Sequence, residues 1–283
     1  MKVEQLRDLL ELAREAARAG AAVIEQSARH VTGRRVEFSD KGSPIDLVTE
    51  VDRESERVIL AVLRRGGVPI VAEEGGREGE ALGTVFYVDP LDGTTNYAHG
   101  HPFHAVSIGL VVDGVPELGV VHAPMLGAVW SGGPRVGASR RDLFRGHEHP
   151  LAVSSVAVLE ASLGATGFPY DRRTTSDDNL SAFGALTKRS HGVLRCGSAA
   201  LDLALVADGT YDVYWERKLK PWDLAAGAAL VLAAGGRISD PWGRPFVAEA
   251  GALVATNAVL HEALLAAIAP HQPSPGSRDS ETR

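Results

Sequence analysis

The spacing of apolar residues changes along this chain from a helical period to a strand period, and the change occurs at Gly66-Gly67. Before it, apolar residues recur at threes and fours over residues 3–24 and again over 51–63, which predicts two amphipathic helices. After it, short β-branched and aromatic runs at residues 68–72 and 84–88 predict buried strands. Because the two periods mix along the chain, we expect a layered α/β or α+β sandwich, in which helices stack on sheets.

The second half of the chain continues this mixture. Asp113-Gly114 joins two apolar runs, residues 104–112 and 118–123, and therefore predicts a β-hairpin. Residues 132–150 are rich in glycine and arginine and are expected to be loops. The other expected elements are a strand over residues 129–131, a helix opening at the Gly-Ser-Ala-Ala segment 197–200, a strand over 211–215 and a helix over 224–234.

The length of 283 residues suggests one large domain or two closely packed ones. We expect residues 1–270 to form a single domain built of two intimate α/β halves. Residues 271–283 contain no aliphatic or aromatic side chain, so they are expected to be a disordered tail.

The composition argues against several classes of protein. There are 36 acidic residues against 29 basic ones, a net charge of −7, which disfavours a binder of nucleic acids or anionic membranes. No apolar stretch approaches the roughly 20 residues that cross a bilayer. Cys196 is the one cysteine, so no intrachain disulfide can form, as is usual in a reducing compartment. We therefore expect a cytoplasmic protein.

The strongest functional signal is the segment that ends the apolar run 84–88. Residues 89–96 read DPLDGTTN. The carboxyl end of a buried strand is where α/β proteins place ligands. Asp89 and Asp92 would repel each other unless a cation lay between them, and Mg²⁺ is held by carboxylates together with phosphate oxygens. Gly93 permits close approach of the backbone, and the amides after it form an anion site. The segment therefore predicts metal ligands beside a phosphate cradle.

Three other acidic segments are weak signals when each is taken alone. Thr49 and Asp52 match a helix-capping pattern. Glu73-Glu74 follows a short strand and has the character of a solvated loop. Asp223 opens a helix, where the helix dipole favours an acid without any function. Their occurrence together with DPLDGTTN favours a common site.

Five motifs in this order resemble those of the inositol monophosphatase family, from about residue 5 to residue 268. They are KxSPxDxVTxxD at residues 41–52, EE at 73–74, DPLDGTTN at 89–96, GSAA at 197–200 and WDxAAG at 222–227.

The resemblance implies a layered αβαβα sandwich of the sugar phosphatase type, usually a homodimer. It also implies hydrolysis of phosphate monoesters that depends on two or three Mg²⁺ ions and is inhibited by Li⁺. The implied metal ligands are Glu73, Asp89, the Leu91 carbonyl, Asp92 and Asp223. The implied substrate and phosphate contacts are Leu91, Asp92, Gly93, Thr94, Gly197, Ser198, Ala199 and Glu216.

The chemistry of a phosphate monoester agrees with these implications. Its dianion repels a nucleophile, and a metal cluster both supplies positive charge and lowers the pKa of bound water. Our hypothesis gives the catalytic roles to Glu73 and Thr94, which orient and activate the water, and to Asp52, which holds Thr94 by a hydrogen bond. The aspartates among the implied ligands hold the ion that stabilises the leaving alkoxide, and no phosphoenzyme is expected.

Glu216 bears on the substrate, since a carboxylate accepts hydrogen bonds from vicinal hydroxyls such as those of inositol. Inositol 1-phosphate or a similar small polyol phosphate is therefore expected. The alternative is the same chemistry on histidinol phosphate, fructose 1,6-bisphosphate or 3′-phosphoadenosine 5′-phosphate. A second alternative is an interaction protein that contacts RNA polymerase or RNA-linked partners, for which residues 217–220 offer a basic surface. The basic stretch 140–145 has no assigned role.

Overall fold

The computed structural model describes residues 1–30, 38–40, 47–80 and 83–272. Its α-helices are α1 (Val3–His30), α2 (Glu50–Leu63), α3 (Thr94–Ala98), α4 (Leu180–Thr187), α5 (Ala199–Ala207), α6 (Pro221–Ala233) and α7 (His261–Ile268). Short 3₁₀ helices lie at Arg64–Gly66, Pro124–Leu126, Leu159–Ala161, Ala248–Ala250 and Ala269–His271.

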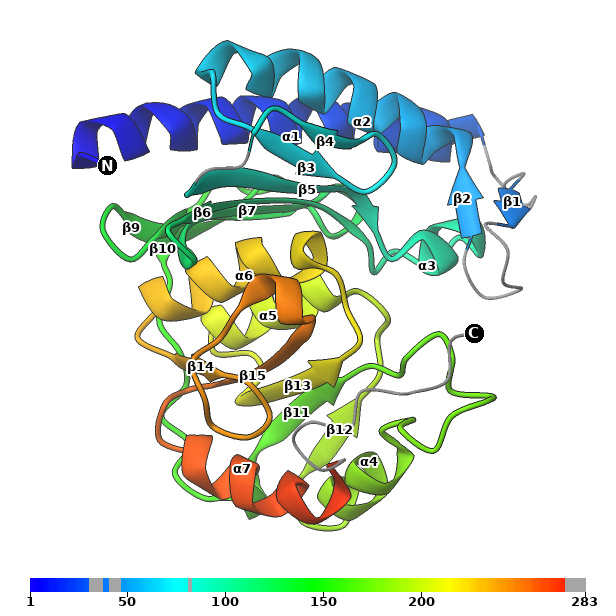
Figure 1. Cartoon of the computed structure of the whole chain (residues 1–283), viewed down its shortest axis with the longest axis vertical. Helices are drawn as coiled ribbons and strands as arrows, with labels where there is room; N and C mark the ends of the chain where they lie inside the picture. Colours follow the sequence, from blue (N-terminus) through cyan, green and yellow to red (C-terminus); the bar gives the residue numbers. More distant parts are fainter. Residues whose placement is uncertain (31–37, 41–46, 81–82, 273–283) are drawn as a thin grey trace.

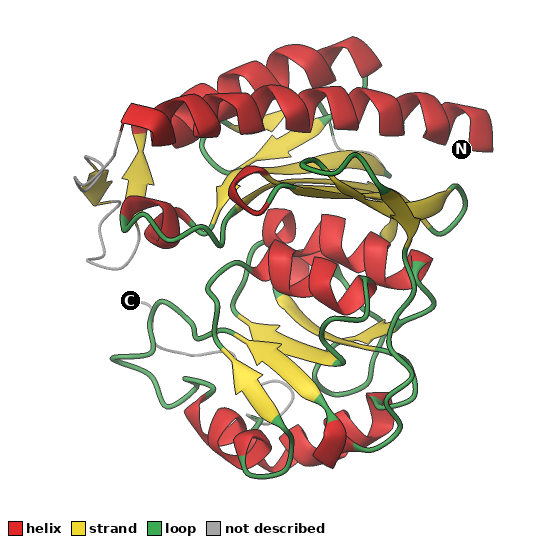
Figure 2. Cartoon of the chain, turned by 180° about the vertical axis from the view of Figure 1, so that it is seen from behind, coloured by secondary structure: helices red, strands yellow, loops and turns green. Residues whose placement is uncertain are grey.

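The helices alternate with two sheets in layers (Figures 1 and 2). Helices α1 and α2 cover one face of an eight-stranded sheet, and α5 and α6 lie between its other face and a five-stranded sheet. Helices α4 and α7 cover the outer face of the smaller sheet. The αβαβα sandwich implied by the resemblance is thereby confirmed.

The apolar stripe of α1 explains why this helix lies on the large sheet. Leu6, Ala13, Ala17 and Ile24 recur on one side of the helix, and none is more than 1% exposed. They join one core with Val106, Ile108 and other residues of the sheet. The predicted helices over residues 3–24 and 51–63 are therefore confirmed by α1 and α2.

The large sheet is mixed. Strands β3 and β5 pair in parallel, and all other neighbours within this sheet are antiparallel. In spatial order its strands are β10 (Glu148–Pro150), β9 (Gly137–Asp142), β8 (Ala128–Gly133), β7 (Val115–Ala123), β6 (Ala105–Val112), β5 (Thr84–Asp92), β3 (Ile70–Ala72) and β4 (Gly76–Glu78). The hairpin predicted at Asp113-Gly114 joins β6 to β7.

The prediction of loops over residues 132–150 is wrong, because β9 and β10 lie there. These two strands extend the edge of the sheet through pairing with β8. Their residues are exposed or only partly buried, so the sequence lacks the apolar alternation that identifies a strand. Long-range pairing overrides the local pattern at this edge.

Strand β5 also differs from the prediction, which ended it at Val88. It continues through Asp92, and its register against β6 shifts between Asp89 and Asp92. Residues three apart in a regular strand point to opposite faces. An irregularity of this kind re-aims side chains, and here it lets both carboxylates face the same cavity.

The smaller sheet is ordered β12 (Gly192–Leu194), β11 (Leu163–Thr166), β13 (Val213–Arg217), β15 (Ala252–Thr256) and β14 (Arg237–Ser239). A separate ribbon pairs β1 (Phe38–Asp40) with β2 (Leu47–Thr49). The first half of the KxSPxDxVTxxD motif, residues 41–46, lies outside the described residues. So do residues 273–283 of the predicted tail, whereas its first residue, His271, belongs to the last 3₁₀ helix.

Helix α6 packs unusually close to the large sheet, and two glycines allow it. Gly109 on β6 and Gly119 on β7 are paired neighbours. A Cβ atom at Gly109 would lie 2.5 Å from the Ala226 nitrogen, and one at Gly119 would lie 2.1 Å from the Ala226 oxygen. The backbone of α6 therefore rests directly on the sheet, which places Asp223 near the end of β5.

We expect Gly119→Ala to destabilise the protein by about 1–3 kcal/mol, because the added methyl group meets backbone atoms that cannot rotate away. Denaturant unfolding measures this change. The matched control is Gly184→Ala in α4, where nothing lies within 4 Å of an added Cβ. That variant should be neutral or more stable by up to about 1 kcal/mol. Equal unfolding free energies for the two variants would contradict the close-packing account.

Candidate active site and metal centre

A cavity of about 310 Å³ opens between the large sheet and the loops that precede α5 and α6. It contains eleven of the twelve residues that the sequence assigned to a site. These lining residues are Glu73, Asp89, Leu91, Asp92, Gly93, Thr94, Gly197, Ser198, Ala199, Glu216 and Asp223. The twelfth, Asp52, does not line the cavity, but it contacts Thr94.

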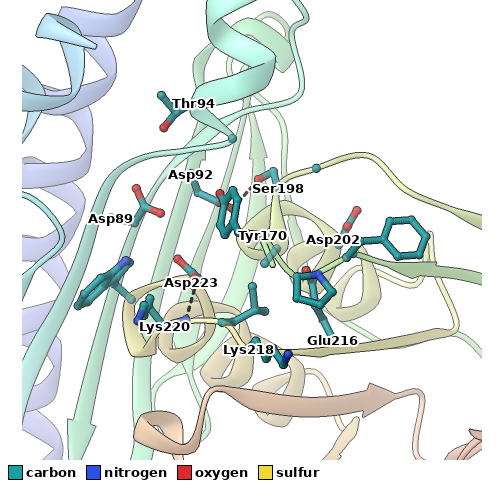
Figure 3. Close-up of a pocket in the computed structure, with 18 of the residues that line it drawn as sticks. Asp89, Asp92, Thr94, Tyr170, Ser198, Asp202, Glu216, Lys218, Lys220 and Asp223 are labelled. Carbon is teal, nitrogen blue, oxygen red and sulfur yellow. Dashed lines mark hydrogen bonds between the residues drawn. The ribbon is translucent and has the colours of Figure 1, made fainter. Parts of the chain in front are cut away.

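Three carboxylates converge at one end of this cavity (Figure 3). Asp89, Asp92 and Asp223 each present an oxygen that lies within 4.8 Å of the other two. Asp89 accepts a hydrogen bond from the Leu91 amide (2.9 Å), and Asp223 accepts one from the Lys220 amide (2.7 Å). These backbone donors fix the carboxylates in place and leave their other oxygens to face one another.

Burial and mutual repulsion disfavour the charged forms of these carboxylates, and a bound cation would favour them. Burial, together with the charges of Glu73, Asp92 and Asp223, raises the pKa of Asp89 well above its usual range. Burial likewise raises the pKa of Asp223, and it raises the pKa of Asp92 to about 6. Every donor in the cluster is an oxygen, which suits a hard divalent cation such as Mg²⁺. The residues present therefore fit a metal centre.

Glu73 lies beside the carboxylate cluster, although it follows a different strand from the one that carries Asp89 and Asp92. It follows β3 directly, and its backbone amide donates to the Val88 carbonyl on β5 (3.2 Å). Its negative charge contributes to the raised pKa of Asp89, Asp92 and Asp223. The parallel pairing of β3 with β5 thus brings a fourth carboxylate to the same end of the cavity.

The Thr94 hydroxyl makes the predicted hydrogen bond to Asp52. Its Oγ1 lies 3.1 Å from Asp52 Oδ1 and 3.0 Å from the Leu91 carbonyl, so it can donate to either oxygen. Asp52 is 2% exposed on α2. The hydroxyl is thereby held at the edge of the cavity with its lone pairs available.

Gly93 precedes Thr94 with φ of 93°, a conformation that side chains rarely adopt. A Cβ atom there would lie 3.0 Å from the Phe103 carbonyl and 3.3 Å from the Gly197 carbonyl. Asn96 Nδ2 spans the same gap, because it donates to Phe103 (2.7 Å) and to Cys196 (2.8 Å). The DPLDGTTN segment and the loop before α5 are thus joined directly.

The Gly-Ser-Ala-Ala segment contacts the carboxylate cluster and also forms part of the cavity wall. Ser198 Oγ donates to Asp92 Oδ2 (2.6 Å), and the Ala200 amide donates to the same oxygen (2.7 Å). These bonds lower the pKa of Asp92 and oppose the effect of burial. Ser198 lines the cavity, as its predicted contact with substrate requires, and its hydroxyl also bonds a predicted metal ligand.

Glu216 lies on β13 at the other end of the cavity from Asp89 (Figure 3). Tyr214 Oη donates to its Oε2 (2.6 Å). The carboxylate occupies space that only glycine leaves open at residue 167, where a Cβ atom would lie 1.9 Å from Oε1. Burial raises the pKa of Glu216 to about 7.

Four charged residues of the cavity wall were not predicted as site residues from the sequence. They are Arg195, Asp202, Lys218 and Lys220. Asp202 sits in the first turn of α5, where an acid is favoured by the helix dipole, so its sequence position carried no distinct signal. Of the basic segment 217–220, Arg217 is 9% exposed and pairs with Asp177, which leaves the two lysines toward the cavity.

This chain is similar to known proteins along nearly its whole length. The model of the inositol monophosphatase family matches residues 5–273. An inositol-1-monophosphatase of Synechocystis is 40% identical over 267 residues, which cover 93% of this chain and 90% of that protein.

Two further relatives are similarly close. The Nus factor SuhB of Pseudomonas aeruginosa is 40% identical over 275 residues, or 95% of this chain and 98% of that protein. The solved structure of an inositol monophosphatase from Anabaena superposes with a TM-score of 0.83 at 40% identity, covering 95% of this chain and 97% of that one.

The raised pKa values predict how stability depends on pH. Acids of the unfolded chain titrate near pH 4, whereas Asp92 and Glu216 titrate at about 6 and about 7 in the folded protein. The folded protein therefore binds more protons over this interval, and these groups make stability fall as pH rises toward 7. In EDTA, we expect the Tm of Asp92→Asn to exceed that of the wild type by more at about pH 7.5 than at about pH 5.

Added Mg²⁺ should raise the Tm of the wild type more at the higher pH, because a cation favours the ionised carboxylates. Differential scanning calorimetry measures both effects. A Tm difference that is independent of pH would refute the assignment of the raised pKa to Asp92.

Proposed function

Because this chain belongs to the inositol monophosphatase family and is a phosphoric monoester hydrolase, we propose that it hydrolyses inositol 1-phosphate or a similar small polyol phosphate in a Mg²⁺-dependent reaction. The observation that carries this proposal is the convergence of Asp89, Asp92 and Asp223 beside Thr94 in one cavity. Along the described residues, no helix has both the length and the apolar character needed to cross a membrane.

Two or three Mg²⁺ ions would be held by the carboxylates of Glu73, Asp89, Asp92 and Asp223 and by the Leu91 carbonyl. When bound, these ions supply positive charge for the phosphate and lower the pKa of a coordinated water. Inhibition by Li⁺ belongs to the same proposal.

The chain's own residues would then position the reacting groups. Asp52 holds the Thr94 hydroxyl, so that this hydroxyl and the Glu73 carboxylate would orient the attacking water and activate it. The amides of Gly93 and Thr94 bind phosphate oxygens at the start of α3. Water is the nucleophile in this scheme, so no phosphorylated side chain forms.

The other end of the cavity would receive the alcohol part of the substrate. Glu216 accepts hydrogen bonds from vicinal hydroxyls, and the Gly197–Ala199 segment lines the wall beside it. Lys220 lies at the cavity and would attract the phosphate dianion. Histidinol phosphate, fructose 1,6-bisphosphate and 3′-phosphoadenosine 5′-phosphate are the competing esters. We also propose a homodimer, on the resemblance alone, and a cytoplasmic location, on the composition of the chain.

A second candidate function is an interaction role with RNA polymerase or RNA-linked partners, since one close relative carries the name Nus factor SuhB. The basic segment 217–220 offers little support for it. Arg217 is buried against Asp177, and Lys218 pairs with Asp171 (2.7 Å). A pull-down with RNA polymerase tests this role, and an Asp92→Asn variant that still binds would separate it from catalysis.

We expect Asp92→Asn to lower kcat at saturating Mg²⁺ and substrate by at least about 100-fold, because the change removes one carboxylate of the proposed metal centre. Phosphate release measures this loss. The control is Glu160→Gln, which neutralises an exposed acid in the 3₁₀ helix Leu159–Ala161 and should leave kcat unchanged. Turnover by Asp92→Asn within a few-fold of the wild type would show that the metal assignment is wrong.

Glu216→Gln should lower kcat/KM for inositol 1-phosphate by roughly 10- to 100-fold, the value of a hydrogen bond to a charged group, and should spare phenyl phosphate. The wild-type preference for inositol 1-phosphate over phenyl phosphate should rise with pH through about 7, as Glu216 ionises, and the variant should lose this dependence. A panel of esters, assayed with Mg²⁺ and with or without Li⁺, provides both measurements. No release from any ester would overturn the proposed function.

A further inference from the structure

A second carboxylate lies next to Glu216, at the end of the cavity away from Asp89 (Figure 3). It belongs to Asp202, in the first turn of α5, and the residue lines the cavity while being only 1% exposed. Its Oδ1 is enclosed and has no hydrogen-bond partner among the residues that the structure describes.

This isolation sets Asp202 apart from the other acids of the cavity. Asp89 and Asp223 accept bonds from backbone amides, Asp92 accepts bonds from Ser198 and Ala200, and Glu216 accepts one from Tyr214. Burial and the charges of Glu216 and Asp92 raise the pKa of Asp202 well above its usual range. An enclosed acid without a partner destabilises a fold, so packing alone gives no reason for this residue.

The nearest cation does not supply the missing partner. Arg195 also lines the cavity, and its charge lowers the pKa of Asp202. Within the described part of the chain, however, no ion pair joins the two side chains within 4 Å, and Arg195 is exposed. Its positive charge disfavours an ammonium group as the ligand of Asp202 and leaves a neutral donor, such as a hydroxyl, as the suitable partner.

We propose that Asp202 is a specificity-determining residue, which accepts a hydrogen bond from a hydroxyl of the substrate's alcohol part, next to the hydroxyl that Glu216 binds. This inference rests on the proposed function. The two neighbouring carboxylates select phosphate esters whose alcohol carries adjacent hydroxyls, since only these satisfy both acceptors at once. An ester whose alcohol part has no hydroxyls forms no hydrogen bond with Asp202, so this residue does not raise its kcat/KM.

The test compares inositol 1-phosphate with phenyl phosphate in Asp202→Asn. We expect kcat/KM for inositol 1-phosphate to fall roughly 10- to 100-fold, and kcat/KM for phenyl phosphate to stay within about threefold of the wild type. The Tm should rise by about 2–4 °C, because the variant removes an enclosed carboxyl group that has no partner and whose charged form burial disfavours. Asp202→Ala should give the same ranking of the two esters.

The matched control is Asp212→Asn. Asp212 is also buried, but its carboxylate accepts bonds from the Leu163 amide (2.7 Å) and from Ser154 Oγ, and it does not line the cavity. Its variant should lose stability and leave the ratio of the two esters unchanged, as expected for a residue with a structural role.

Equal losses on both esters, or a fall in Tm like that of Asp212→Asn, would overturn the role given to Asp202. So would a wild type that hydrolyses phenyl phosphate but no polyol phosphate, although the chain would then remain a phosphatase. If the wild type hydrolyses neither ester, the proposed function fails. In that case, if the Tm of Asp202→Asn is not higher than that of the wild type, the conclusion that Asp202 lacks a hydrogen-bond partner is wrong as well.

Discussion

The contact between α6 and the large sheet fixes the geometry on which the site depends. Because Gly109 and Gly119 carry no side chain, the helix backbone at Ala226 lies directly on β6 and β7. The first turn of the same helix carries Asp223, while β5, the neighbour of β6, carries Asp89 and Asp92. A bulkier side chain at either glycine would lift the helix and separate the carboxylates. The packing of the α6 backbone against the sheet backbone thus sets the distances between Asp223 and the two aspartates of β5.

The fold gathers these charges against their mutual repulsion, and hydrogen bonds offset part of that repulsion. Hydrogen bonds from backbone amides and from Ser198 hold the charged forms of Asp89, Asp92 and Asp223. They do not cancel the effect of burial, since the pKa of each carboxylate remains raised. The carboxylates therefore still lower the free energy of unfolding, and a bound cation would remove part of this cost. Metal affinity and the stability of the metal-free protein would then depend on the same carboxylate oxygens.

Features of the fold that depend on residues close together in the sequence were predictable, and features that depend on distant strands were not. The DPLDGTTN segment brings two carboxylates and a glycine together within eight residues, so a metal and phosphate site could be predicted from the sequence. The layers followed from apolar periods in α1, α2 and the central hairpin. Strands β9 and β10 were missed because pairing at a sheet edge, not apolar alternation, makes them strands. The register shift at Asp89 was missed for the same reason, since it exists only in relation to β6.

Asp202 is a residue whose proposed role could be recognised only from its surroundings in the fold. In the sequence it is an acid in the first turn of a helix, a position that the helix dipole alone accounts for. In the fold its neighbours include a second acid, Glu216, and its own enclosed oxygen lacks a partner. The acids at the metal end are held by amides and suit a cation, whereas the acid pair at the far end lies beside Arg195 and suits hydroxyl donors. If both proposals hold, one cavity uses carboxylates for two purposes, and the local donors and charges distinguish them.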